Sequence, residues 1–197
     1  MQNENRSLSI VGCGWFGLPL AKEMLAGGWE VKGSTTSEAK LEQLYAMGIK
    51  PYLAQFPSKD DIGTELFDSA FLLINLPPGR RNPDVADTYP EAISQVVQTA
   101  TRLGRTRKIV FVSSTSVYGH HHDLDYIDEA TELMPETNAG KALWQAEQVV
   151  ARCGIPAIIL RFGGLAGRAG IREIFLPEKA AWTMDIKRSI FCTSTMP

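Results

Sequence analysis

The sequence contains few of the residues that several common kinds of protein chemistry require. It has only three cysteines in 197 residues, Cys13, Cys153 and Cys192, and no two of them form a C-x-x-C pair. The odd number and wide spacing predict free thiols, with neither a disulfide framework nor a cysteine zinc site. No stretch approaches 18 apolar residues, and the polar residues 1–7 lack the apolar region of a signal peptide. We therefore expect a cytoplasmic protein with no membrane partner.

An excess of positive charge is also missing. The chain has 20 basic and 22 acidic residues, and its basic residues are scattered instead of forming a stripe. This pattern predicts no nucleic-acid partner.

The three histidines, His120, His121 and His122, are consecutive and stand near Asp123 and Asp125, which raises the question of a metal site. Adjacent side chains in a loop point in different directions, and the chain has no further histidine, so we predict no metal.

Apolar runs rich in strand-forming residues alternate along the chain with amphipathic helical patterns. At 197 residues and 44% hydrophobic composition, the chain is long enough for one substantial core. The alternation predicts an α/β fold, a Rossmann-type doubly wound parallel sheet with strand order 3-2-1-4-5-6 and helices on both faces. Strands are expected at residues 8–11, 30–33, 51–53, 70–75, 108–113 and 157–161, and helices at 15–26, 37–47, 88–103 and 138–152.

The first predicted strand leads into a G-x-G-x-x-G turn made by Gly12, Gly14 and Gly17, with Trp15 and Phe16 between the last two glycines. In a dinucleotide-binding turn, the first glycine permits the tight turn and the second lets the backbone approach a pyrophosphate. The third allows close packing of helix on strand, and the phosphates rest on the helix N-terminus. Because a strand precedes the motif and a helix follows it, the turn predicts binding of NAD or NADP.

The end of the second predicted strand bears on the choice between the two cofactors. An acidic residue there favours NAD by accepting a hydrogen bond from the ribose 2′-hydroxyl. This chain has Ser34, Thr35 and Thr36 instead, which can donate to a 2′-phosphate, so we favour NADP. The same hydroxyls could serve only to cap the next helix.

A third candidate cofactor contact follows the predicted strand at 70–75. Asn75, Leu76 and Pro77 stand where a loop should border the ligand, since ligands bind at the carboxyl ends of strands in open α/β sheets. Arg80 and Arg81 come next, and we assign them no role because a solvated basic loop explains them equally well.

The most specific pattern joins two segments. Ser113–Gly119, with the sequence S-S-T-S-V-Y-G, ends the strand at 108–113, and Thr137–Lys141 opens a helix about 20 residues later. With the opening turn and Leu160–Leu165, they resemble the extended short-chain dehydrogenase/reductases, the NAD(P)-dependent epimerase/dehydratase group. More narrowly, residues 8–170 are similar to its atypical YeeZ-type branch in bacteria. The resemblance implies an NAD(P)-dependent oxidoreductase or epimerase acting on a small polar substrate such as a nucleotide sugar.

The resemblance also implies roles for single residues. Ser114 takes the place of the hydroxyl that binds the substrate oxygen, and Ser113 lies beside it, toward the cofactor. Lys141 matches the lysine that holds the nicotinamide ribose and lowers the pKa of a tyrosine four residues earlier. Thr137 occupies that tyrosine position, and its hydroxyl cannot exchange a proton near neutral pH. Tyr118 is the alternative acid or base. A purely structural role is the other alternative: the hydroxyls of Ser113–Ser116 can hydrogen-bond to their own backbone, and Lys141 can be a surface residue of its helix.

Two readings of function follow. The first is the enzyme just described, and the alternative is a non-catalytic NAD(P)-binding sensor or regulatory protein. The resemblance implies a substrate lobe after the last strand, so we divide the chain into an NAD(P)-binding domain at 1–168 and a remnant of that lobe at 169–197. Read from the third base of each codon, Arg188–Pro197 can encode a block similar to the family's V-N-x-V-H-x-x-D, so we hypothesise that a frameshift truncated the chain near residues 170–185.

Overall fold

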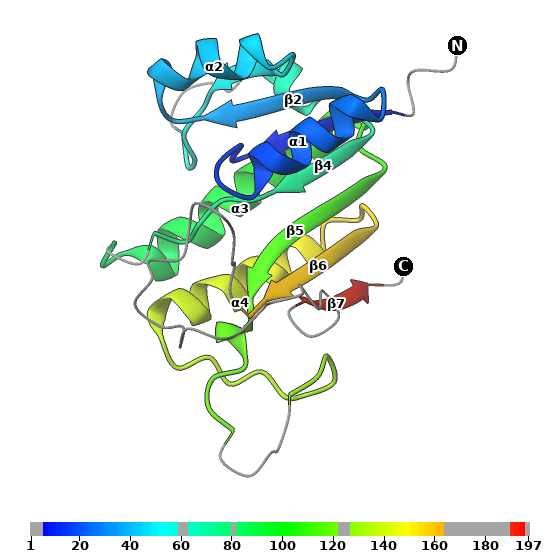
Figure 1. The fold of residues 1–197 in the computed structure, drawn as a ribbon. Helices are drawn as coiled ribbons and strands as arrows, with labels where there is room; N and C mark the ends of the chain where they lie inside the picture. Colours follow the sequence, from blue (N-terminus) through cyan, green and yellow to red (C-terminus); the bar gives the residue numbers. More distant parts are fainter. Residues whose placement is uncertain (1–5, 59–62, 80–81, 122–126, 164–189, 196–197) are drawn as a thin grey trace, which may run out of the picture.

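A single seven-stranded sheet forms the centre of the molecule (Figure 1). The computed structural model describes residues 6–58, 63–79, 82–121, 127–163 and 190–195, the last of these as backbone only. The strands are β1 (Ser7–Val11), β2 (Glu30–Thr35), β3 (Lys50–Leu53), β4 (Phe71–Ile74), β5 (Lys108–Ser114), β6 (Ala157–Phe162) and β7 (Ile190–Thr195). The α-helices are α1 (Gly17–Ala26), α2 (Leu41–Ala46), α3 (Val85–Leu103) and α4 (Asn138–Ala151), and the short 3-10 helices are η1 (Glu38–Lys40), η2 (Thr64–Phe67) and η3 (Thr115–Val117).

The strand order is β3-β2-β1-β4-β5-β6-β7. The first six strands are parallel and follow the predicted order 3-2-1-4-5-6, which confirms the Rossmann-type fold. β7 was not predicted: it pairs with β6 in the antiparallel direction, from Phe162 opposite Ile190 to Ala157 opposite Thr195. Its segment was interpreted as a remnant of a lobe, although isoleucine, phenylalanine and threonine favour strands. Residues 169–189 and 196–197, the rest of that remnant, lie outside the described part of the chain.

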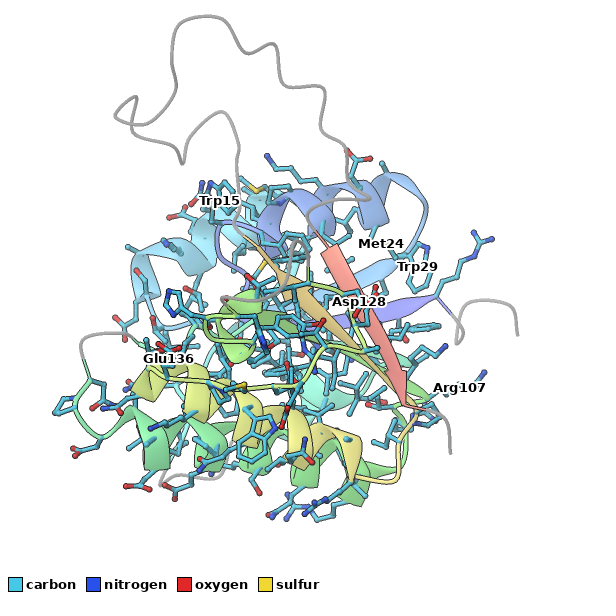
Figure 2. All side chains as sticks on the ribbon, turned by 90° about the horizontal axis from the view of Figure 1, so that it is seen from below. Trp15, Met24, Trp29, Arg107, Asp128 and Glu136 are labelled. Atoms are coloured by element: carbon cyan, nitrogen blue, oxygen red, sulfur yellow. The ribbon has the colours of Figure 1, made fainter. Side chains whose placement is uncertain are left out.

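Helices cover both faces of the sheet, and each face has its own apolar core. α1 and α2 lie on one face and α3 and α4 on the other, as the blue and the green and yellow ribbons show (Figures 1 and 2). Side chains of β5 alternate between the two cores: Ile109 and Phe111 are buried toward α3 and α4, whereas Val110 and Val112 pack on the other side. This period of two is what a strand covered on both faces requires.

The strand order reverses between β1 and β4, which are neighbours although β2 and β3 come between them in sequence. In open α/β sheets, ligands bind outside the carboxyl ends of the strands at such a reversal. The loops after β1, β2, β4 and β5 therefore define the candidate site. No helix in the described part of the chain is long and apolar enough to cross a membrane.

Candidate dinucleotide site and the adjoining buried network

The glycine turn after β1 is held in a conformation that only glycine adopts easily. Gly12 has a φ of +91°, and a Cβ there would lie 2.5 Å from the carbonyl oxygen of Asn75. A Cβ on Gly17 would come within 3.0 Å of the Gly12 carbonyl oxygen, so this glycine lets α1 pack closely on the turn. At Gly14, by contrast, a Cβ would meet no atom within 4 Å. Gly14 therefore leaves open space at the position where the sequence predicts a pyrophosphate.

Two neighbouring strand ends fix this turn in place. The Gly12 N–H donates to the Ser34 hydroxyl oxygen at 2.9 Å, and the Asn75 side-chain amide donates to the Gly12 carbonyl at 2.9 Å. The Asn75 backbone N–H donates in turn to the carbonyl of Val11. The turn is thus tied to β2 on one side and to the end of β4 on the other.

The N-terminus of α1 opens beside Gly14. Its N-cap residue is Phe16, which has no side-chain oxygen to accept from the first turn of the helix. The Leu18 N–H donates to the carbonyl of Gly14. Backbone N–H groups and the positive end of the helix dipole make such a terminus suited to phosphate. The geometry fits a dinucleotide pyrophosphate placed on this helix end.

The residues between the last two glycines of the turn lie in different surroundings. Trp15 is 44% exposed, and the labelled side chain lies at the edge of the molecule in Figure 2. Phe16 turns toward the sheet and makes an edge-to-face contact with Phe162, with the ring centroids 5.1 Å apart. Phe16 thereby fixes the start of α1 against the end of β6.

The three hydroxyl residues at the end of β2 have separate roles. Ser34 is buried and accepts from the Gly12 N–H, so its hydroxyl supports the turn. The Thr35 hydroxyl oxygen accepts from the backbone N–H of Ser37 at 3.2 Å, and Thr36 is exposed. Ser34 therefore supports the glycine turn, whereas Thr35 and Thr36 lie nearer the surface. The sequence pattern did not make this distinction.

The loop after β4 is anchored by α3. The Tyr89 hydroxyl donates to the carbonyl of Leu76 at 2.9 Å, and burial raises the pKa of Tyr89 above its ordinary value. Pro77 is exposed beyond this anchor. Arg80 and Arg81, to which the sequence assigned no role, lie outside the described residues.

Ser113 and Ser114, at the end of β5, face in opposite directions. Ser113 is buried, and its hydroxyl donates to Glu147 of α4 at 2.6 Å. Ser114 is half-buried, and its hydroxyl oxygen accepts from the Ser116 N–H at 3.2 Å, which caps η3. Because a hydroxyl that accepts one bond can still donate, Ser114 keeps an O–H donor near the surface.

A buried polar network lies beneath this strand end. The Arg161 guanidinium donates from Nε and one terminal nitrogen to the two oxygens of Glu147, at 3.0 and 2.7 Å. Its other terminal nitrogen donates to the Tyr118 hydroxyl at 2.9 Å, and the guanidinium lies 5.0 Å from the centre of the Tyr118 ring. Burial by itself would lower the pKa of Arg161, but hydrogen bonding and charge attraction from Glu147, then from Tyr118, raise it.

Sequence reasoning did not single out Glu147 or Arg161 as a pair. Arg161 belongs to the Leu160–Leu165 segment that carries part of the resemblance, and Glu147 was read only as part of a helix. Both are at most 5% exposed. A charged residue in the middle of an apolar strand was the available signal, since buried charges are almost always paired.

The start of α4 places the other predicted catalytic positions. Thr137 is the N-cap residue, and its hydroxyl oxygen accepts from the Gly140 N–H at 3.0 Å. Lys141 is exposed and makes no side-chain hydrogen bond to any residue that the structure describes. It borders an open groove of about 510 Å³. The other residues of this groove are Leu133, Met134, Pro135, Trp144 and Gln145.

The opposite face of α4 is the buried one. Its inward residues, Gly140, Ala142, Leu143, Ala146, Glu147 and Val150, follow a helical period. Glu147 lies six positions after Lys141, which at 100° per residue directs the two side chains about 120° apart. The structure therefore groups Ser113, Tyr118, Glu147 and Arg161, and it does not bring Lys141 into that group.

The histidine and cysteine residues that the structure describes have ordinary surroundings. His120 is ion-paired with Glu136 at 3.0 Å, and a ring nitrogen of His121 is 3.0 Å from the carbonyl oxygen of Glu132. No group of three or more metal-ligating side chains occurs within the described residues, which exclude His122, Asp123 and Asp125. Cys13 and Cys153 are free thiols, and burial raises the pKa of Cys13 to about 11.

Comparisons with known proteins agree with this geometry. The chain is 36% identical over 168 residues to the protein YeeZ of Escherichia coli strain K12, an alignment that covers 82% of this chain. The chain spans 60% of the length of YeeZ. No family model matches the chain.

Solved structures of several proteins share the fold, and two of them are described below. One is a short-chain dehydrogenase/reductase superfamily protein from Agrobacterium tumefaciens with bound NAD, at a TM-score of 0.65 and 19% identity, covering 79% of this chain and 48% of that one. The other is UDP-glucuronic acid 4-epimerase from Bacillus cereus in complex with NAD, at a TM-score of 0.66 and 16% identity, covering 80% of this chain and 56% of that one. The chain therefore shares its fold with these two NAD-bound proteins.

Proposed function

We propose that the protein binds NAD(P) across the carboxyl ends of β1, β2 and β4 and acts on a small polar substrate of the nucleotide-sugar type. The observation that carries the proposal is Gly14. The turn around it is fixed by Ser34 and Asn75, yet the space beside it is open. A turn that is held by hydrogen bonds on both sides and has open space at Gly14 fits a pyrophosphate on the N-terminus of α1.

The preference for NADP over NAD rests on fewer residues than the sequence pattern suggested. Ser34 supports the turn, which leaves Thr35 and the exposed Thr36 near the place of the adenosine ribose. Neither carries a charge that would repel a 2′-phosphate. We expect tighter binding of NADPH than of NADH, and we expect Thr36→Asp to weaken NADPH binding more than NADH binding, because the carboxylate repels the extra phosphate.

The substrate is proposed to lie beyond β5, beside Ser114. Its hydroxyl can donate to a substrate oxygen, and bound nicotinamide would supply or accept a hydride there. Tyr118 is fully buried with its hydroxyl held by Arg161, so we assign it to holding the strand end instead of exchanging protons. The proposal of a nucleotide-sugar substrate is supported by the fold shared with UDP-glucuronic acid 4-epimerase. Lys141 remains a predicted contact to the nicotinamide ribose.

The test measures cofactor binding in two glycine variants that should fold equally well. NADPH and NADH are titrated against the purified chain while energy transfer from tryptophan to the nicotinamide is recorded. Gly14→Ala adds a methyl group where the pyrophosphate should lie, and Gly63→Ala adds one where a Cβ also meets nothing within 4 Å. We expect Gly14→Ala to raise the Kd by about tenfold or more, a loss of roughly 1.4 kcal/mol, and Gly63→Ala to leave it unchanged.

Urea unfolding of both variants shows whether the fold is intact. Saturable binding that Gly14→Ala does not weaken would place the cofactor elsewhere. A folded wild-type chain without saturable binding of either nucleotide would overturn the proposal altogether. Addition of UDP-sugars to the nucleotide-loaded chain, followed by absorbance at the nicotinamide band, then tests the substrate class separately.

A further inference from the structure

A second polar cavity opens at the other edge of the sheet, where the strands begin. It has a volume of about 330 Å³. Its lining residues come from the starts of β1, β2, β4 and β5 and from the end of α3, namely Ser7, Glu30, Lys32, Asp68, Ser69, Ala70, Gly104, Arg105 and Arg107. Figure 2 shows the labelled Arg107 at this edge and Trp15, beside the glycine turn, on the opposite side of the molecule. The cavity is thus separate from the candidate dinucleotide site.

The lining has an excess of positive charge, although the whole chain has a net charge of −2. Three of the side chains are basic and two are acidic. Asp68 and Arg105 form an exposed ion pair at 2.9 Å, which offsets one charge of each sign. The other charged side chains of the lining are Lys32, Arg107 and Glu30. The C-terminus of α3 adds a partial negative charge here, so anion binding would depend on the basic side chains.

Lys32 is the most unusual member of the cavity. It is 5% exposed, and its ammonium group donates to the backbone carbonyl of Asp68. An ammonium group has three N–H donors, so this carbonyl satisfies one of them. Glu65 is also close enough to interact with it, but the Glu65 carboxylate is hydrogen-bonded by Lys50 and Tyr52, and Lys50 is the main cause of its lowered pKa. Buried ammonium groups normally acquire further acceptors.

Ser69 supplies an independent sign of a missing partner. It is 3% exposed, and its side-chain oxygen has no hydrogen-bond partner among the described residues. It lines the same cavity as Lys32. Buried hydroxyl groups are rarely left in this state, because an unsatisfied buried donor is costly.

We propose that this cavity is a binding site for a small oxyanion, namely phosphate or the phosphate group of a phosphorylated metabolite. Lys32 supplies the buried charge, and the Ser69 hydroxyl donates a hydrogen bond. Arg107 adds a second positive charge to the lining, which favours an anion over a neutral ligand. The volume exceeds that of a single phosphate, so a phosphate monoester with a small organic group also fits.

The test is a calorimetric titration with inorganic phosphate and, in parallel, with ribose 5-phosphate, at constant ionic strength maintained with sodium chloride. Because phosphate could also bind at the N-terminus of α1, the titrations are made in the Gly14→Ala background. Lys32→Met removes the buried charge with a side chain of similar length. Lys108→Met is the matched control, since Lys108 stands at the start of β5, is exposed, and does not line the cavity.

We expect saturable binding that Lys32→Met weakens by about tenfold or more, as for loss of a charged hydrogen bond, and that Lys108→Met changes by less than about twofold. Ser69→Ala should weaken binding by about threefold to tenfold without lowering the stability of the unliganded chain, because it removes an unsatisfied hydroxyl. Tighter binding of ribose 5-phosphate than of phosphate would identify a phosphate monoester as the ligand, and the reverse order would identify free phosphate.

Absence of saturable binding up to about 10 mM of either probe would overturn the proposal. Equal weakening by Lys32→Met and Lys108→Met would also overturn it, because the effect would then reflect general surface charge. Both results leave the proposed cofactor site untouched, since that site lies at the opposite edge of the sheet.

Discussion

The two halves of the carboxyl edge of the sheet are built by different means. Around β1, β2 and β4, the candidate dinucleotide site is made of backbone: three glycines, a helix N-terminus and two side chains that hold the turn. Around β5, β6 and α4, the corresponding positions are filled by a buried network of charged and hydroxyl side chains. One half presents hydrogen-bond donors outward, and the other turns most of its polar groups inward.

The motif residues of the two halves therefore differ in what they do in the structure. In the first half, the motif residues and the residues that shape the site are the same, because each glycine is required by a close approach or an open space. In the second half, Ser113 and Tyr118 match a catalytic pattern, yet their hydroxyls bond with Glu147 and Arg161. Ser114 alone of the matched hydroxyls on β5 keeps a donor near the surface.

Disruption of the buried network should give the largest change in stability. Arg161→Met leaves the Glu147 carboxylate buried without its cation, and we expect it to lower the free energy of unfolding by about 3–5 kcal/mol. Arg105→Met breaks the ion pair with Asp68, whose side chains are 58% and 53% exposed, and should cost less than about 1 kcal/mol. Urea unfolding of the two variants measures the contrast directly.

A double variant sharpens this comparison. Arg161→Met combined with Glu147→Leu removes both charges, so it should recover part of the loss caused by Arg161→Met alone. Recovery should be incomplete, because the hydroxyls of Ser113 and Tyr118 then lose their partners, at about 1–3 kcal/mol for each buried group. If Arg161→Met costs no more than Arg105→Met, the network does not hold this half of the site together.

The glycine turn should respond to a single methyl group. Gly12→Ala places a Cβ 2.5 Å from a backbone oxygen at a φ of +91°, and we expect a loss of about 2–3 kcal/mol together with loss of NAD(P) binding. Gly28→Ala is the control, since Gly28 has a φ of +77° and open space around its Cβ position. It should show the cost of the dihedral angle alone, about 1–2 kcal/mol, with cofactor binding intact. Equal losses would mean that the turn can shift away from Asn75.

Much of the fold was predictable because it depends on local patterns. Alternation of strands and amphipathic helices, and glycines such as Gly104 that end helices, determined the elements and their order. The turn at Gly12, Gly14 and Gly17 could be placed on the same basis. β7 escaped prediction because its pairing with β6 depends on a contact distant in sequence, which no local period reveals.

Roles that depend on the direction in which a side chain points could not be predicted from local sequence patterns. The spacing of Thr137 and Lys141 matches a catalytic pair, but spacing alone does not say which face of α4 is buried. That face is decided by Leu143, Ala146 and Glu147 packing against the sheet and α3. Likewise, the three hydroxyls after β2 look equivalent in sequence, and only the bond from Gly12 shows that Ser34 supports the turn.

The smallest of these effects concerns Thr137, where the two views of α4 predict different outcomes. If Thr137 stands in place of a lost catalytic tyrosine, Thr137→Tyr should create turnover. If Thr137 is only the N-cap residue, whose hydroxyl oxygen accepts from the Gly140 N–H, its change to tyrosine or to alanine should instead lower the free energy of unfolding by about 1 kcal/mol. Thr137→Asn keeps a capping oxygen, and its free energy of unfolding should remain within a few tenths of a kcal/mol of the wild type.

We expect thermal or urea unfolding to show this order of stability. We also expect Thr137→Tyr to gain no activity on UDP-sugars, because a side chain at the N-cap position starts outside the helix. Turnover in that variant would show that the second half of the site retains its catalytic geometry after all.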